Sequence, residues 1–193
     1  MKKMKLIVYS LLAVTLFACK KTGIETKSED ALYKNSPSSV VPAALAQGLW
    51  FYGTISAISY FDRDGHRLGN DYEAGREYQF SNVNGQGRMK FYQYLGTRNA
   101  SNCVSEYFTY KEGTAVFNGD TFTFYPVKGN FKTIKKDCST GNGTSVRNAE
   151  GDDLEPITYR WEIKEIENKT YFYTYLEEDV DHEEVVFVYQ FSN

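Results

Sequence analysis

The chain has 193 residues, which suits one domain of ordinary size with its own hydrophobic core. Its formal net charge of −3, from 22 basic and 25 acidic side chains, argues against nucleic-acid binding, which requires a basic surface. Its 16 tyrosines and 13 phenylalanines are side chains that favour β-strands.

The first 18 residues have the pattern of a secretory signal peptide. Three lysines lie among the first five residues, and an apolar run from Leu6 to Ala18 follows them. A basic start before a short apolar segment is typical of an export signal, and the run is too short to span a bilayer. We therefore expect residues 1–18 to be removed from an exported protein.

The apolar run ends in Leu16-Phe17-Ala18-Cys19, which resembles the lipobox of bacterial lipoprotein precursors. In those precursors the Leu and the small residue before the Cys guide cleavage, and the thiol accepts diacylglycerol. The resemblance implies that Cys19 is the lipid-attachment residue, bearing acyl chains such as palmitate. The alternative is an ordinary signal peptide that leaves Cys19 as a free thiol.

A lipidated Cys19 would hold the mature protein to a membrane. The residue after Cys19 is Lys20, and not the Asp that often retains lipoproteins at the inner membrane. This favours a location at the outer membrane, with the protein facing the periplasm or the cell surface. Without its three signal lysines the mature chain has 19 basic and 25 acidic side chains, a formal charge of −6. Anchoring is therefore expected from the lipid and not from charge.

Residues 19–44 are expected to form a flexible tether, and residues 45–193 a single β domain. The tether is polar from Lys20 to Pro37 and lacks apolar periodicity, so it cannot offset the entropy of ordering. A short helix is expected before the domain. Ser38 or Ser39 could cap this helix, Pro42 suits its first turn and Gly48 could end it.

Strand signals dominate from Leu49 onward. Apolar and polar residues alternate in segments such as 89–95 and 159–164, and this period of two indicates strands buried on one face. Turn-forming residues separate the segments at Asp64-Gly65, Asn84-Gly85, Glu112-Gly113, Asn118-Gly119-Asp120 and Asn168-Lys169. About nine or ten strands are expected, near 49–61, 76–81, 87–95, 104–111, 114–118, 121–127, 130–136, 157–166, 170–176 and 185–191. The sequence therefore predicts an all-β fold, an antiparallel meander.

Gly48-Leu49-Trp50 at the start of the first strand resembles the lipocalin-like superfamily, where a turn of helix leads through Gly-x-Trp into the barrel. The resemblance implies a barrel of 8–10 strands with Trp50 plugging one end. The chain ends in a strand-like run, Val185–Phe191, without the C-terminal helix of lipocalins. It is thus more similar to the poorly characterised lipocalin-like lipoproteins of Gram-negative bacteria. The alternative architecture is a β-sandwich, in which Trp50 would simply pack in the core.

Two cysteines, Cys103 and Cys138, remain after Cys19. A pair of cysteines in an exported protein favours a disulfide, and both lie in segments rich in Gly, Asn and Ser. The alternative is two free thiols. Two thiols and two distant histidines do not indicate a zinc site.

Catalytic motifs are missing from the sequence, which contains no Gly-x-Ser-x-Gly, no His-Glu-x-x-His and no phosphate loop. The two histidines, His66 and His182, lie in expected loops. We therefore expect no enzyme and no cofactor. A hydrolytic enzyme using loop carboxylates is the remaining catalytic hypothesis.

The densest charge cluster is the acidic segment 177–184. Its candidate metal ligands, suited to calcium, are Glu177, Glu178, Asp179 and Asp181. The alternative is a solvated hairpin connection whose charges discourage aggregation.

Three tyrosines, Tyr171, Tyr173 and Tyr175, alternate with Phe172, Thr174 and Leu176 and so share one face of a strand. If Phe172 and Leu176 point inward, the phenol rings line up outside and are candidate ligand-binding residues for a glycan or a protein. The alternative is that the rings pack as cross-strand pairs.

Three functional hypotheses follow. The first is a non-enzymatic binding or interaction lipoprotein that engages an envelope protein, a glycan or a small apolar ligand. The second is a lipocalin-type carrier, which requires an open apolar cavity of several hundred Å³. The third is the enzyme, which requires acids that converge in a pocket.

Overall fold

The structure, a computed structural model, describes residues 31–46, 48–54, 60–61, 67–68 and 72–192. Its strands are β1 (Leu49–Thr54), β2 (Tyr60–Phe61), β3 (Arg67–Leu68), β4 (Tyr72–Val83), β5 (Gln86–Arg98), β6 (Val104–Asn118), β7 (Thr121–Lys136), β8 (Gly143–Asn148), β9 (Ile157–Ile166), β10 (Lys169–Leu176) and β11 (Val185–Ser192). Residues 31–34 are helical, and a short 3₁₀ helix, η1, spans Gly151–Leu154. Among these described residues no helix has the length and apolar character to cross a membrane.

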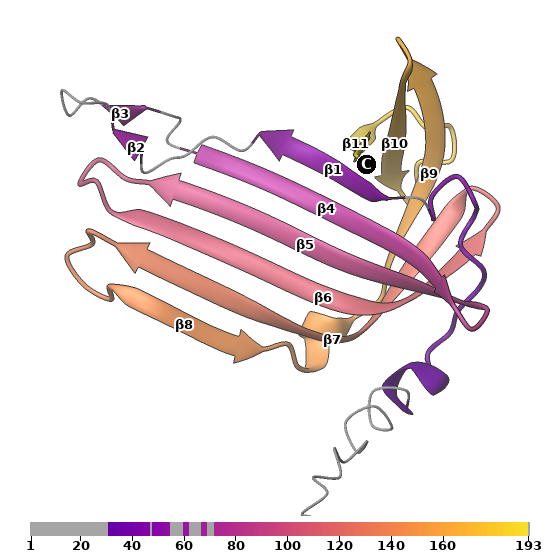
Figure 1. Cartoon of the computed structure of the whole chain (residues 1–193), viewed down its shortest axis with the longest axis horizontal. Coiled ribbons are helices and arrows are strands. Elements are labelled where there is room, and N and C mark those ends of the chain that lie inside the picture. The colour runs from indigo at the N-terminus through magenta and orange to yellow at the C-terminus, as the bar shows by residue number, and fades with distance from the viewer. Residues whose placement is uncertain (1–30, 47, 55–59, 62–66, 69–71, 193) are drawn as a thin grey trace, which may run out of the picture.

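Nine strands form one antiparallel sheet in the order β6-β5-β4-β1-β11-β10-β9-β7-β8. Because β6 also pairs with β7, eight of these strands form a near-ring. Strand β7 pairs with β9 only through residues 121–124, and its residues 130–136 pair with β8 instead. The near-ring is therefore closed at one end and opens at the other, where β4–β8 continue as a broad sheet (Figure 1). The predicted all-β antiparallel meander is confirmed, and the single sheet differs from the two stacked sheets of a sandwich.

Strands β6 and β7 are longer than the sequence indicates, because Glu112-Gly113 is not a hairpin turn. Glu112 pairs with Lys128 and Gly113 pairs with Pro126, so Val127 is an extra residue in β7. A Cβ on Gly113 would lie 2.7 Å from the Cα of Pro126. The glycine thus permits a close backbone approach at a bulge, which the turn interpretation missed.

Two further differences concern turns and edges. Asn84-Gly85 forms a turn with positive φ at both residues, as predicted, but the β9–β10 turn is Glu167-Asn168, one residue earlier than expected. Strand β8 was not predicted from the sequence, because it is exposed throughout and has no apolar alternation. Asp64-Gly65 lies outside the described residues.

Aromatic side chains fill the closed end of the near-ring. Trp50, Phe172 and Tyr189 are fully buried, and Tyr78 stacks on Tyr189 with ring centroids 4.6 Å apart. The core cluster consists of Val41, Leu45, Trp50, Tyr78, Phe80, Met89, Ala115, Phe122, Phe124, Phe172 and Tyr189. Such ring contacts add to the free energy of burial, so this end is a packed core.

Residues 36–46, mostly assigned to the tether by the sequence analysis, pack against the closed end of the sheet. The backbone N–H of Ser39 donates to Ala115, and its carbonyl accepts from the N–H of Gly87. Val41 and Leu45 are buried. The expected helix at Pro42 is a single turn in which the N–H groups of Leu45 and Ala46 donate to the Pro42 carbonyl. The residues that are helical lie earlier, at 31–34.

Cys103 and Cys138 form the predicted disulfide. It lies just before β6 begins and just after β7 ends, with the two Cα atoms 4.3 Å apart. The bond therefore joins the two strands at the open end of the sheet, far from the aromatic core.

Candidate functional site

A cup lies at the open end of the near-ring, on the sheet face that carries the core. Its cavity has a volume of about 530 Å³. The lining residues are Tyr52, Gly53, Ala74, Gly75, Arg76, Gln93, Tyr94, Leu95 and Phe187. A smaller cavity of about 90 Å³ shares Arg76 and Gln93 with it and reaches the core at Tyr78 and Phe122. We use "cup" for these two adjoining spaces.

The strand period explains how these side chains reach the cup. Tyr78 and Phe80 of β4 are buried in the core, so Arg76 and Ala74 lie on the same face, two and four residues before Tyr78. Ala74 pairs with Leu95, and Arg76 pairs with Gln93. The same face therefore changes from closely packed rings at one end to an open cavity at the other.

Arg76 is the central polar group of the cup. Its guanidinium carbon lies 4.0 Å from the Phe187 ring centroid and 5.6 Å from that of Phe91. Cation–π contacts with both rings position the guanidinium between β5 and β11. In the described part of the chain, no carboxylate lies within ion-pair distance of Arg76.

Other basic residues follow on the same face of the broad sheet. Lys111 lines the smaller cavity, and burial lowers the pKa of its amine, although the nearby carboxylate of Asp153 opposes this shift. Arg147 pairs with Phe131 across β7 and β8, and its guanidinium carbon lies 4.0 Å from that ring centroid. Asp153 receives two hydrogen bonds from Arg147, at 2.6 and 3.1 Å.

The carboxylates of the broad sheet take the opposite strand phase. Glu77 is adjacent to Arg76 in β4, and Glu112 is adjacent to Lys111 in β6, so both point to the outer face. Glu106 shares the phase of Glu112, and Glu73 shares that of Glu77. Basic side chains occur on both faces of the described broad sheet, whereas its strand carboxylates lie in the outer-face phase.

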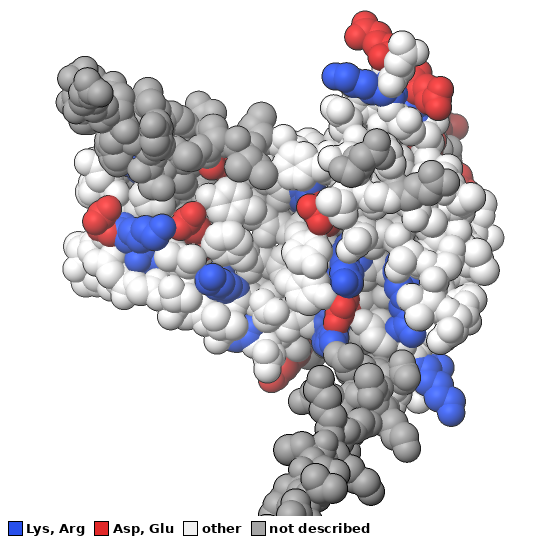
Figure 2. Space-filling model, in the orientation of Figure 1, with Lys and Arg blue, Asp and Glu red and all other residues white. Residues whose placement is uncertain are grey.

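The outer face carries an aromatic block of Tyr92, Tyr94, Phe108 and Tyr110. Tyr92 and Tyr110 have ring centroids 4.8 Å apart, and those of Tyr94 and Phe108 are 5.2 Å apart. Together with Phe51 they line a groove of about 290 Å³. Figure 2 shows a broad area without charged side chains over the sheet, between separate groups of charged residues.

The three tyrosines of the predicted row differ in burial. Tyr175 is fully buried, donates a hydrogen bond to Glu162 and stacks on His182 with ring centroids 4.4 Å apart. Tyr171 and Tyr173 are half-buried, and Lys164 lies over the Tyr173 ring at 4.6 Å. Leu176, expected to point inward, is 43 % exposed. A register shift between Thr174 and Tyr175 ends the simple alternation that this expectation assumed.

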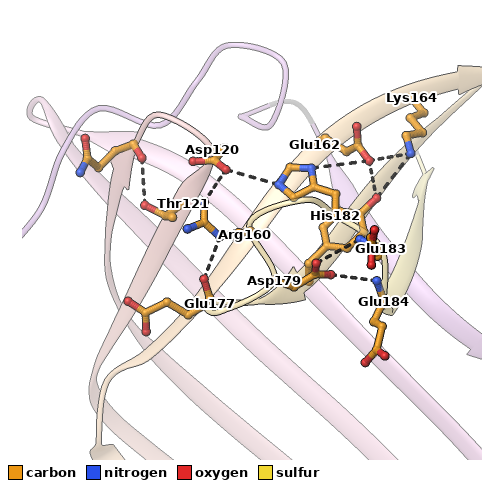
Figure 3. Close-up of polar contacts among 12 residues, drawn as sticks. Asp120, Thr121, Arg160, Glu162, Lys164, Glu177, Asp179, His182, Glu183 and Glu184 are labelled. Carbon is orange, nitrogen blue, oxygen red and sulfur yellow. Dashed lines mark hydrogen bonds and ion pairs between the residues drawn. The ribbon is translucent and has the colours of Figure 1, made fainter.

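His182 joins the acidic loop 177–184 to the rest of the sheet (Figure 3). Its Nε2 lies 3.3 Å from a carboxylate oxygen of Asp120, and its Nδ1 lies 4.0 Å from Glu162. Arg160 contacts the same Asp120 oxygen at 2.6 Å and donates through Nε to the Glu177 carbonyl at 2.7 Å. The hydrogen bond from Arg160 is the main reason that the pKa of Asp120 is lowered.

The candidate metal ligands of this loop do not converge. Both carboxylate oxygens of Asp179 accept backbone N–H groups, from Glu183 at 3.0 Å and from Glu184 at 2.8 Å, and these bonds lower the pKa of Asp179. Glu178 and Asp181 are exposed. Throughout the described ranges no group of three His, Cys, Asp or Glu side chains is placed to hold a metal ion. The carboxylate of Asp179 therefore stabilises the conformation of its own loop, through hydrogen bonds to the backbone four and five residues later.

Cys19, the predicted lipid-attachment residue, and His66 lie outside the described residues. The cup and the aromatic block were not identified from the sequence. Arg76 looks like an ordinary strand residue until the register places it between Phe91 and Phe187. The signal available in the sequence was the alternation of Arg76 with Tyr78 and Phe80, which places a basic residue on the buried face of the strand.

Comparison with protein-family models, with curated proteins and with solved structures finds no match to this chain.

Proposed function

We propose that this protein is a lipid-anchored, non-enzymatic binding protein of the bacterial envelope that takes a small ligand into its cup. The observation that carries this proposal is the open cavity of about 530 Å³ beside a filled aromatic core. Ligand sites are typically clefts of roughly 300–1,000 Å³ with apolar walls and a few polar groups. Tyr52, Leu95 and Phe187 supply apolar surface, and Arg76 and Gln93 supply polar groups.

The anchor is proposed from the N-terminal sequence. Leu16-Phe17-Ala18-Cys19 supports lipidation of Cys19, and two or three acyl chains would hold the protein durably to the outer membrane. Replacement of Cys19 by Ser is expected to abolish labelling by palmitate and to release the protein from membranes. Labelling that persists in Cys19→Ser would contradict the anchor.

A lipocalin-type carrier is the more specific version of this proposal. Support for it is that Trp50, the Trp of the Gly-x-Trp motif, is fully buried in the aromatic core of the near-ring. The carrier hypothesis requires a cavity of several hundred Å³, and the cup has one. Unlike an enclosed carrier pocket, the cup opens along the broad sheet, which favours ligands that remain partly exposed.

Nile red, a neutral apolar fluorophore, tests the proposed cup directly. The mature chain with Cys19→Ser is expected to bind one dye molecule saturably, with a blue-shifted emission. Leu95→Trp fills the cup and is expected to weaken binding at least tenfold. The matched control is Val146→Trp on the outer face of β8, where Val146 is 64 % exposed. Equal binding by both variants, or none by the parent protein, would overturn the proposal.

The aromatic block favours a second candidate function, contact with a glycan or an envelope protein. Tyr92 is 39 % exposed and lies against Tyr110, and tyrosine rings suit both kinds of partner. Capture of envelope components on immobilised protein tests this candidate. Loss of a captured component in Tyr92→Ala but not in Tyr52→Ala, a cup variant, would assign the contact to the outer face.

A further inference from the structure

We infer that the ligand of the cup is an amphipathic monocarboxylate, an apolar chain with one anionic head of the fatty-acid type, and that Arg76 binds the head. This inference rests on the proposed binding function and adds the chemical class of the ligand. Its basis is the combination of a guanidinium without a carboxylate partner among the described residues, apolar walls, and broad-sheet carboxylates that lie in the outer-face phase.

The first argument is the geometry of Arg76. Its guanidinium lies over the face of Phe187 and near Phe91, and it also interacts with the hydroxyl of Tyr189, so its neighbours here are aromatic side chains and a neutral hydroxyl. Five N–H donors in a planar fork match a carboxylate bidentately. Among the described residues no carboxylate forms an ion pair with it. An anionic ligand would supply the missing partner.

The second argument is charge complementarity on the scale of the sheet. Arg76, Lys111, Lys135 and Arg147 share the cup face by strand phase, and Asp153 is the carboxylate that approaches them in the described structure. Glu73, Glu77, Glu106 and Glu112 occupy the opposite phase. Cations without strand carboxylates between them make the cup face more favourable to an anion than the outer face, where carboxylates are interspersed.

The third argument concerns the apolar part of the ligand. The smaller cavity beyond Arg76 is lined by Tyr78, Met89, Phe91, Phe122, Phe124, Ile157 and Tyr159, among others. On the other side of Arg76 lie Tyr52, Leu95 and Phe187. Arg76 thus stands between two apolar surfaces, so a head bound there leaves the chain in contact with aromatic walls. A highly hydrated dianion or an inorganic ion would leave these walls unused.

Paired ligands of equal chain length test the inference. Isothermal titration of the mature Cys19→Ser chain at pH 8 would compare dodecanoate with dodecanol. We expect dodecanoate to bind at least tenfold more tightly, because only its carboxylate forms a hydrogen-bonded charge pair with the guanidinium. Arg76→Gln should remove most of this preference and leave dodecanol binding within about twofold of the parent. Arg76→Lys should retain part of it.

The control variant is Lys132→Gln, which removes a cation over Phe108 on the outer face. It should keep the full preference for dodecanoate. The thermal unfolding temperature of each variant verifies folding before titration. Equal affinity of the parent for dodecanoate and dodecanol would overturn the anionic ligand and leave the proposed function standing. No binding of either by a parent that binds Nile red would overturn the ligand class alone, and no binding of either ligand or of Nile red would overturn the proposed function. An undiminished preference in folded Arg76→Gln would overturn the role of Arg76.

Discussion

The indole N–H of Trp50 donates a hydrogen bond to the backbone carbonyl of Leu45 across 3.1 Å, inside the packed end of the near-ring. Leu45 and Trp50 are both fully buried. The bond fastens the N-terminal segment to the first strand, so the segment and the aromatic core stabilise each other.

Trp50→Phe is expected to lower the free energy of unfolding by about 2 kcal/mol, because it leaves the buried Leu45 carbonyl without its donor and opens a small cavity. Trp161→Phe is the matched control. The Trp161 indole N–H is buried and has no acceptor among the described residues, so its loss should cost less than about 1 kcal/mol. Urea unfolding measures both values. Equal losses would contradict a stabilising Trp50 hydrogen bond.

The disulfide gives a second prediction. Cys103 and Cys138 are 35 residues apart, and in the chain-entropy model a loop of this length contributes about 3–4 kcal/mol. The double variant Cys103→Ser, Cys138→Ser should lose stability of this size in urea unfolding under oxidising conditions. Addition of reductant should lower the unfolding midpoint of the parent and not that of the double variant. A reductant effect on both would show that the disulfide is not its cause.

The bulge at Gly113 gives a third prediction. A Cβ there would meet the Tyr125 carbonyl and lie 2.7 Å from the Pro126 Cα, so Gly113→Ala should cost about 3 kcal/mol. The control is Gly85→Ala. Gly85 has φ +79° and open space around it, so its cost should be about 1 kcal/mol, from backbone strain alone. Thermal unfolding compares the two. A smaller loss at Gly113 than at Gly85 would rule out the close approach.

Asp153 gives a prediction about pH. Hydrogen bonds from Arg147, together with the Glu150 backbone N–H, lower the pKa of Asp153 to about 2 from its ordinary 3.8. A depressed folded-state pKa means that the unfolded chain binds more protons, so this stabilisation is present above about pH 4. It is lost as the pH falls through about 2.

The urea midpoint of Asp153→Asn should therefore lie below that of the parent at pH 6, and the difference should shrink by pH 2. Arg147→Gln should show the same pH dependence, because it removes the other half of the interaction. A difference that stays constant from pH 6 to pH 2 would contradict an ionised, paired Asp153.

Local patterns in the sequence predicted the features that depend on neighbouring residues. Alternation gave the strands, Asn84-Gly85 gave a turn, and the two cysteines gave a disulfide. The bulge at Gly113 depends on the pairing of β6 with β7, and its sequence alone resembles a turn. Strand β8 depends on its pairing with β7, and its sequence alone resembles a loop. Register also decides that Tyr175 is buried against Glu162 and His182.

The cup could not be predicted for the same reason. Its walls come from the β4–β5 hairpin together with β1 and β11, and β11 is about 90 residues or more from the others in sequence and reaches β1 only when the near-ring forms. No local pattern indicates that Arg76 and Phe187 are in contact. The sequence shows that Arg76 and Glu77, like Lys111 and Glu112, point to opposite faces of their strands. It does not show which of the two faces contains the cup, because that depends on which face is buried.

The position of a bound chain tests the central claim most directly. Nuclear Overhauser effects between the methylene protons of dodecanoate and isotope-labelled methyl groups of the protein would locate it. We predict contacts to Leu95 and Ala74, which line the cup, and none to Val146 on the outer face. Contacts to Val146 or to outer-face rings, without any to Leu95 and Ala74, would contradict binding in the cup.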